Sequence, residues 1–142
     1  MKDRIIDKIR EIETLCEELA SICPKRFGEY DSDIRSKAAC ERYVERIVES
    51  FVDIAFLIIR LKALSPPDDE KGSFDRLAQE GIITPDLAER LKDAKGMRNI
   101  LAHQYGMIDD RIVFDAVSDE IPRDAKELII TVKDALKTEL IW

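Results

Sequence analysis

The sequence is poor in the residues that build tight turns and metal centres. Its 142 residues include 5 Gly, 5 Pro and 1 His, and aromatic residues make up only 6%. So few Gly and Pro argue against a turn-rich β-sandwich. The single His and the three widely spaced Cys give no Cys/His set with the spacing of a zinc site. We therefore expect neither a metal ion nor a cofactor.

Long apolar runs and a secretory leader are also lacking. The longest apolar run, Ile54 to Ile59, is flanked by charged residues and is far shorter than a membrane helix, which needs about 20 residues. The first residues, MKDRIIDKIREIE, contain no uninterrupted apolar stretch, so no signal peptide is visible. We expect a cytoplasmic chain without membrane contact. Its odd number of cysteines is typical of reduced thiols, here Cys16, Cys23 and Cys40.

The charge balance is acidic overall and basic in one segment. The chain has 30 Asp and Glu against 23 Lys and Arg, a net charge of −7. This disfavours non-specific nucleic-acid binding by the whole surface. Between Arg90 and Tyr105, however, four basic residues stand against the single acid Asp93. An ordinary solvated helix face is the alternative interpretation of this local cluster.

Apolar residues recur at helical spacing over most of the chain. Ile5, Ile9, Ile12, Cys16, Leu19 and Cys23 fall on one stripe and predict a helix over about 2–23. Pro24 and Gly28 break this pattern. A longer helix is expected from Asp31 or Ser32, either of which can cap it, to about Ala63.

The second half of the chain predicts shorter helices and one long one. Ser73 is expected to cap a short helix that ends at Gly81, and Thr84-Pro85 to open a helix that continues to His103. After Gly106 we expect a loop with a short helix or turn, and then a final helix with Pro122 in its first turn. No strand–helix alternation or internal repeat is present.

The stretch from Phe51 to Ile59 is apolar almost all round. A helix that is apolar on every side is buried on more than one face, and in a small chain a second copy can cover the extra face. Asp53 within this stretch needs a partner, because an unpaired buried carboxylate is costly. The sequence therefore predicts one domain over 1–142, an all-α, antiparallel four-helix-type bundle with short accessory helices, and a homodimer.

One segment, 96–105, concentrates residues that can do chemistry. It holds Arg98, Asn99, His103 and Tyr105, whereas phosphate loops, GxSxG and HExxH are absent. Asn99 and His103 are four residues apart, so Asn99 can orient the imidazole on one helix face. Arg98 and His103 are about 140° apart around a helix and flank one face loosely. Two copies meeting there would bring Arg and His together from both chains.

This segment resembles the RX4HXY motif of HEPN proteins, specifically the HepT-like toxins. Arg98, four residues, His103, one residue and Tyr105 match the motif position by position. The wider string RNILAHQYGMIDDRIVFDAV and the upstream pairs Tyr30-Asp31 and Ser73-Phe74 resemble the family pattern as well. The similarity covers nearly the whole chain.

The resemblance implies a metal-independent ribonuclease that is the toxin of a type II-like toxin–antitoxin pair and acts as a dimer. Arg98 and His103 would be catalytic and Asn99 supporting, and Tyr105 would contact RNA. The implied partner is an MntA-like nucleotidyltransferase that neutralises the toxin by attaching AMP to Tyr105. The chemistry suits RNA, because an imidazole titrates near neutral pH and a guanidinium matches phosphate oxygens.

Two other interpretations stay open from the sequence. One is a catalytically inactive HEPN module that binds nucleotide or protein, which the acidic composition favours. The other is a structural helical dimerisation protein, in which His103 caps a helix and Tyr105 is a half-buried bundle tyrosine.

Overall fold

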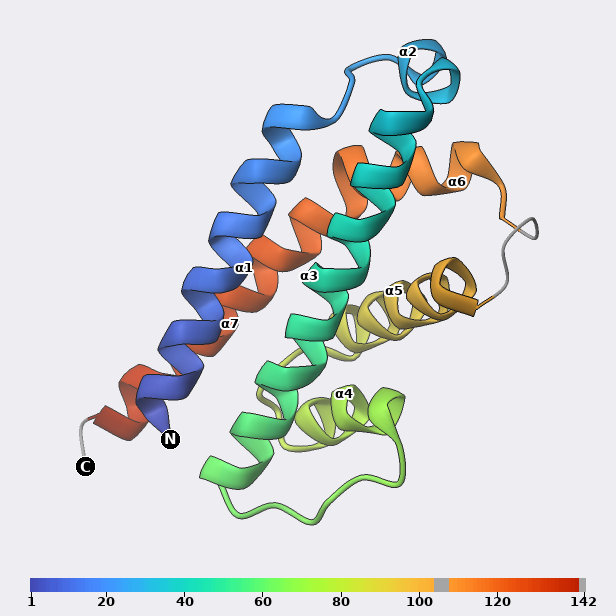
Figure 1. Cartoon of the computed structure of the whole chain (residues 1–142). Coiled ribbons are helices and arrows are strands. Elements are labelled where there is room, and N and C mark those ends of the chain that lie inside the picture. The colour runs from blue at the N-terminus through green and yellow to red at the C-terminus, as the bar shows by residue number, and fades with distance from the viewer. Residues whose placement is uncertain (104–107, 141–142) are drawn as a thin grey trace.

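The computed structural model describes residues 1–103 and 108–140, with side chains 138–140 excepted, and in these ranges it has helices and their connections but no strand (Figure 1). The elements in order are α1 (Lys2–Ile22), α2 (Phe27–Ser32), α3 (Ile34–Leu61), α4 (Glu70–Gln79), α5 (Pro85–His103), α6 (Asp110–Asp115), the π-helical turn η1 (Ala116–Glu120) and α7 (Ile121–Leu140). The predicted all-α class is confirmed.

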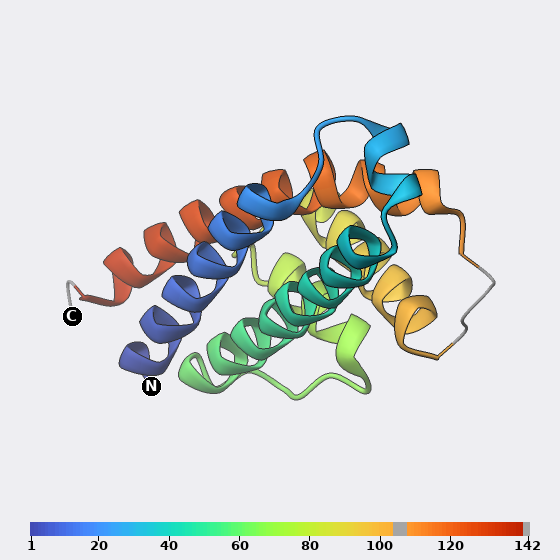
Figure 2. The ribbon, with the colours of Figure 1, turned by 45° about the horizontal axis from the view of Figure 1, so that its top comes forward.

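Helix α3 occupies the centre of the molecule. It packs most extensively against α1 and also against α4 and α5, while α7 contacts both α1 and α5 (Figures 1 and 2). Phe51, Ile54 and Ile58 of α3 are at most 2% exposed. Apart from the exposed Asp53 and the half-buried Phe56, the stretch 51–59 is thus covered by helices of its own chain. It needs no second copy to bury it, so this motive for the predicted dimer does not hold.

Several helix ends follow the sequence signals. α1 spans almost the predicted residues, and α4 ends where Gly81 takes a φ of 73°. The Ile82 N–H donates to the Leu77 carbonyl at 2.9 Å, which closes a Schellman-type C-terminus that requires a left-handed residue. Two predicted N-caps are wrong. Asp33 caps α3 and Asp69 caps α4, in place of Asp31 or Ser32 and of Ser73.

The reason for these two corrections is local. Asp31 and Ser32 belong to α2, a six-residue helix that the sequence did not predict. Ser73 lies inside α4, fully buried, and its hydroxyl donates to the Glu70 carbonyl at 2.5 Å. In both cases the aspartate that precedes the helix offers the carboxylate oxygen that accepts the free N–H groups.

The predicted final helix with Pro122 in its first turn is confirmed, because α7 begins at Ile121. α6, η1 and α7 follow one another without a break, so the helical path runs from Asp110 to Leu140 (Figure 2). Pro122 is the second residue of α7 and has no N–H for the carbonyl one turn before it. The wider π turn directly before Pro122 shifts the hydrogen-bond register at this point.

The three thiols are partly or fully buried. All three cysteines are free, Cys40 is fully buried, and burial raises its pKa to about 12. Burial likewise raises the pKa of Cys16 to about 11. The sequence interpretation of Cys16 and Cys23 as small buried hydrophobic residues holds in part, because both pack against the core but are only partly buried.

Candidate functional site

The candidate residues lie on α5, and the start of this helix is fixed by its sequence. Thr84 Oγ1 accepts a hydrogen bond from the Leu87 N–H at 3.1 Å, and Pro85 occupies the first helical position, where no N–H is needed. The predicted Thr-Pro start is confirmed. From there α5 runs unbroken through Gly96 to His103.

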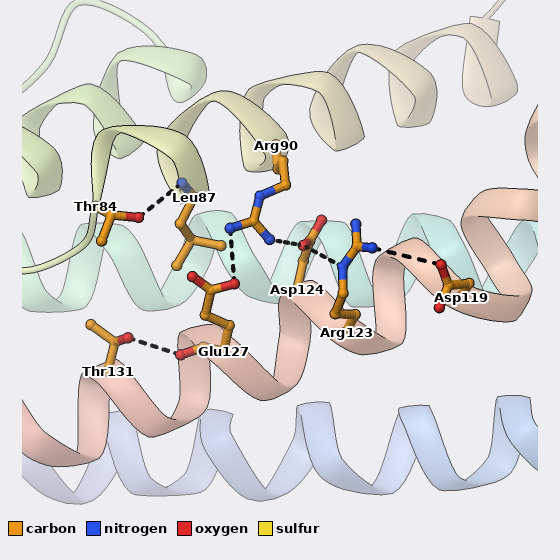
Figure 3. A network of polar contacts seen from close by, with 8 residues as sticks. All are labelled: Thr84, Leu87, Arg90, Asp119, Arg123, Asp124, Glu127 and Thr131. Carbon is orange, nitrogen blue, oxygen red and sulfur yellow. Dashed lines mark hydrogen bonds and ion pairs between the residues drawn. The ribbon is translucent and has the colours of Figure 1, made fainter.

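Arg90 ties the first half of α5 to α7. Its Nη1 donates to Asp124 Oδ1 at 2.5 Å and its Nη2 lies 2.9 Å from Glu127 Oε2, as Figure 3 shows. Asp124 is only 3% exposed, and Arg123 Nε lies 3.8 Å from the same carboxylate. The hydrogen bonds to Glu127 and Asp124 raise the pKa of Arg90. The ion pairs of Arg90 with Asp124 and Glu127 therefore hold α5 and α7 together.

The next basic residues of α5 are paired as well. Lys92 Nζ lies 2.7 Å from Glu89 Oε1 and 3.0 Å from Asp75 Oδ1 on α4, and these contacts raise its pKa. Lys95 is 7% exposed and pairs with Glu70, also on α4. The basic cluster seen in the sequence is thus neither an unpaired face nor a simple solvated one, because its members bridge helices.

Arg98 contacts α3, but some of its N–H donors have no hydrogen-bond partner among the described residues. Its Nη2 donates to Glu49 Oε1, and its side chain is 21% exposed. Its Nε is buried and has no hydrogen-bond partner among the described residues. A guanidinium has five N–H donors. Glu49 therefore fixes one edge of the group and leaves the others for a further acceptor.

His103 is the last residue of α5 and is exposed. Asn99 lies one turn earlier on the same helix and is half-buried, and in the described part of the chain no hydrogen bond joins the two side chains. The rise of an α-helix separates Arg98 and His103 by about 7.5 Å along the axis. Both therefore lie within the last turns of α5. Tyr105 lies outside the described residues.

Helix α6, which follows segment 104–107, has a well-anchored start. Asp109 caps α6 by accepting the Arg111 N–H at 2.9 Å, and Lys37 Nζ on α3 lies 2.8 Å from Asp110 Oδ2. The hydrogen bond to Asp110 raises the pKa of Lys37. Burial, and then the Asp110 charge, raise the pKa of the half-buried Glu41. The described flanks of segment 104–107 are therefore held by α5 on one side and by α3 and α6 on the other.

Two further findings concern the described residues alone. In 1–103 and 108–140, no group of three or more His, Cys, Asp and Glu side chains is arranged to hold a metal ion. No helix in the same ranges is long and apolar enough to cross a membrane.

Glu49 is the site residue that sequence reasoning missed. It lies 49 positions before Arg98, and only the packing of α3 against α5 brings the two side chains together. On α3 it is one of many exposed acids, and a single sequence carries no signal that distinguishes it from the others.

The fold places an Arg and an exposed His near the end of α5, and the comparisons with known proteins assign this helical chain to a class of ribonucleases. The family model described as "Ribonuclease HepT-like" matches residues 12–131. The mRNA nuclease HepT of Shewanella oneidensis is 29% identical over 136 residues, which cover 94% of this chain and 98% of that protein. The tRNA nuclease HepT of Aphanizomenon flos-aquae is 30% identical over 65% of this chain and 63% of that protein.

Comparison with solved structures indicates the same family. The tri-AMPylated Shewanella oneidensis HEPN toxin in complex with its MNT antitoxin has a TM-score of 0.87 and 29% identity, over 94% of this chain and 99% of that one. The chain belongs to the ribonuclease HepT-like family. The resemblance seen in the sequence is confirmed, and with it the assignment to an enzyme class, the ribonucleases.

Proposed function

We propose that this chain is the toxin of a HepT/MntA-type toxin–antitoxin pair and cleaves RNA without a metal ion through its RX4HXY motif. The observation that carries the proposal is the placement of Arg98 and the exposed His103 within the last turns of α5, with guanidinium donors that Glu49 leaves unused. The four-helix-type bundle serves as the scaffold, and two copies bring their motifs face to face as a homodimer.

The proposed reaction uses the nucleophile that RNA already carries. The 2′-oxygen attacks phosphorus while an imidazole, His103, accepts the hydroxyl proton. The new O2′–P bond forms, the P–O5′ bond breaks, and the 5′-oxygen takes a proton from the His103 of the other copy. Arg98 donates to the phosphate oxygens as their negative charge grows. The products are a 2′,3′-cyclic phosphate and a free 5′-hydroxyl.

Arg98 and His103 should be indispensable for cleavage and dispensable for folding. Both side chains are partly or fully exposed, so Arg98→Ala and His103→Ala should leave the thermal melt nearly unchanged. Loss of a general acid/base costs roughly 10²–10⁴-fold in rate. The measurement is cleavage of labelled RNA by purified wild type and variants. Arg10→Ala, an exposed change on α1, is the matched control and should cleave like wild type.

A catalytically inactive HEPN module that binds nucleotide or protein is the second candidate. The Glu49 contact, which neutralises Arg98, and the net charge of −7 favour it. The same assay separates the two candidates. An inactive module would bind RNA or nucleotide equally well in wild type and in His103→Ala, and neither protein would cleave.

Neutralisation is proposed to occur by AMPylation of Tyr105 by an MntA-like nucleotidyltransferase. The AMP adds a negative phosphodiester and a bulky adenosine two residues from His103, and both oppose an RNA phosphate. The similarity to a tri-AMPylated toxin supports this proposal. Tyr105→Phe keeps the ring and removes the acceptor oxygen.

We therefore expect Tyr105→Phe to fold normally and to resist the partner enzyme. Intact-mass measurement after incubation with that enzyme and ATP should show added AMP on wild type and none on Tyr105→Phe. Tyr43→Phe, on α3, is the control and should be labelled like wild type. Equal labelling of wild type and Tyr105→Phe would place the modified residue elsewhere.

A further inference from the structure

A charged cleft lies between the start of α1 and the end of α3, away from the motif. It has a volume of about 420 Å³ and is lined by Arg4 and Lys8 of α1, by Glu70 of α4, and by Val52, Asp53, Phe56, Leu57 and Arg60 of α3. Figures 1 and 2 both place the first turns of α1 beside the last turns of α3. Nothing in the proposed reaction uses this cleft.

The acids of the cleft are paired, whereas two of its bases are not. Asp53 lies 3.0 Å from Lys8 Nζ, and Glu70 pairs with Lys95 of α5. Burial acts to lower the pKa of Lys8, but its hydrogen bonds to Asp53 and Glu11 outweigh this and raise the pKa, so the ammonium stays charged. Arg4 and Arg60 are exposed and form no ion pair within residues 1–103 and 108–140. In a chain of net charge −7, the cleft therefore has two uncompensated guanidinium groups.

An aromatic ring completes the cleft. Phe56 is half-buried, packs against the core and lines the same cleft as the two arginines. Guanidinium groups that meet the backbone phosphates, together with an aromatic ring on which a base stacks, are the combination that binds single-stranded nucleic acid. Arginine binds phosphate through several donors at once.

The cleft and the motif are joined by one helix face. Glu49, Asp53, Phe56 and Arg60 follow one another at steps of four, three and four and so form a single stripe along α3. Glu49 contacts Arg98, and Arg60 lies about 16 Å further along the helix axis. An RNA strand whose scissile phosphate lies at Arg98 can therefore reach the cleft a few nucleotides away.

We infer that this cleft is a subsite for single-stranded RNA, in which Arg4 and Arg60 bind backbone phosphates and Phe56 stacks on a base several nucleotides from the cleaved bond. The inference rests on the proposed function for the position of the cleaved bond. It predicts that the chain prefers substrates long enough to span both places over a dinucleotide.

The test measures binding and cleavage separately. The binding probe is a labelled, single-stranded RNA of about 12 nucleotides with 2′-O-methyl groups throughout, which cannot be cleaved. The variant is Arg4→Gln with Arg60→Gln. The control, Arg10→Gln with Lys126→Gln, removes the same charge from exposed positions of α1 and α7. Melting curves and light scattering of all three proteins monitor folding and assembly.

Loss of two phosphate contacts should weaken binding about 25-fold at 0.1 M salt and reduce the slope of log Kd against log salt by about 1.4. Phe56→Leu keeps an apolar side chain and removes stacking, and should weaken binding about tenfold. The control should bind like wild type. In cleavage, the Arg4/Arg60 variant should raise KM for the unmodified 12-mer and leave kcat/KM for a dinucleotide unchanged.

The two proposals fail in different ways. Predicted binding changes without cleavage by wild type would overturn the proposed function and support the subsite. Normal cleavage with equal binding by the Arg4/Arg60 variant and the control would overturn the subsite alone. A change of mass in the Arg4/Arg60 variant, with RNA binding intact, would show that a second copy covers the cleft, and would also overturn it. No measurable binding by wild type would contradict both.

Discussion

At the scale of residues, the basic side chains of α5 join this helix to its neighbours, a structural role that the sequence near the motif does not indicate. Arg90, Lys92, Lys95 and Arg98 each contact a carboxylate from another helix. Three of these contacts fix α5 against α7 and α4, and the fourth positions the guanidinium that we propose to be catalytic. Neutralising Arg90, Lys92 or Lys95 should therefore lower the stability of the fold. Neutralising Arg98 should lower the rate of the proposed reaction.

Asp124 gives the sharpest stability prediction. It is 3% exposed and lies between Arg90 and Arg123 (Figure 3). Removal of one partner of a buried pair costs about 3–5 kcal/mol. Because the Arg90 side chain is 32% exposed, we expect Asp124→Asn to cost only about 2–3 kcal/mol in the free energy of unfolding, a fall in Tm of about 6–9 °C.

The control for this change is Asp119→Asn. Its side chain is 72% exposed and lies 3.7 Å from Arg123, so the loss should stay below about 0.5 kcal/mol. Thermal or urea unfolding of the two variants measures both values. Equal effects would show that the buried position of Asp124 contributes nothing.

Sequence alone identified the candidate site residues but not their electrostatic partners. Arg98, Asn99 and His103 were found because the only histidine of the chain stands in a recognisable string. Their assignment to catalysis stays a prediction. Glu49 and Asp124 were not found, because ion pairs between distant helices depend on packing and leave no periodic signal.

At the scale of elements, helix centres were predictable and helix ends only in part. Apolar periodicity fixes which face of a helix is buried, and this located α1, α5 and most of α3. N-caps were harder, since Asp and Ser occur close together around the starts of α3 and α4 and only the local backbone decides between them. The unbroken path through η1 was not predicted, because Pro122 is equally compatible with a new helix start.

The end of α3 contains a strained residue. Ala63 has a φ of 54°, and the Leu64 N–H donates to the Ile59 carbonyl at 2.9 Å, so Ala63 occupies the left-handed position where Gly is preferred. A left-handed conformation costs an L-residue about 1–2 kcal/mol, and a Gly at this position would avoid that cost. Part of the gain in stability would be lost, because Gly makes the unfolded chain more flexible.

We therefore expect Ala63→Gly to stabilise the chain by about 0.5–1 kcal/mol, a rise in Tm of about 2–3 °C. Ala38→Gly, at an exposed position inside α3, should destabilise by about 1 kcal/mol. Melting curves of the two variants give opposite shifts if the backbone conformation is the cause. Two losses of similar size would contradict the strained position of Ala63.

At the scale of the whole molecule, the charge pairing of an acidic chain is compatible with the acidic substrate that we propose. The acids near Arg98 and in the α1–α3 cleft form ion pairs, and exposed arginines remain where RNA is proposed to lie. The single domain over 1–142 and the homodimer stay predictions. The apolar stretch of α3 no longer argues for the dimer, so the argument for it is the composite site.

The central claim is that Arg98 and His103 cleave RNA by attack of the 2′-oxygen, without a metal ion. The most direct measurement is incubation of end-labelled RNA with wild type and His103→Ala in the presence of EDTA, followed by analysis of the product ends. Wild type should leave 2′,3′-cyclic phosphate and 5′-hydroxyl ends at an undiminished rate, and His103→Ala should be slower by roughly 10²–10⁴-fold. Cleavage that EDTA abolishes, or that His103→Ala retains at the wild-type rate, would contradict the account.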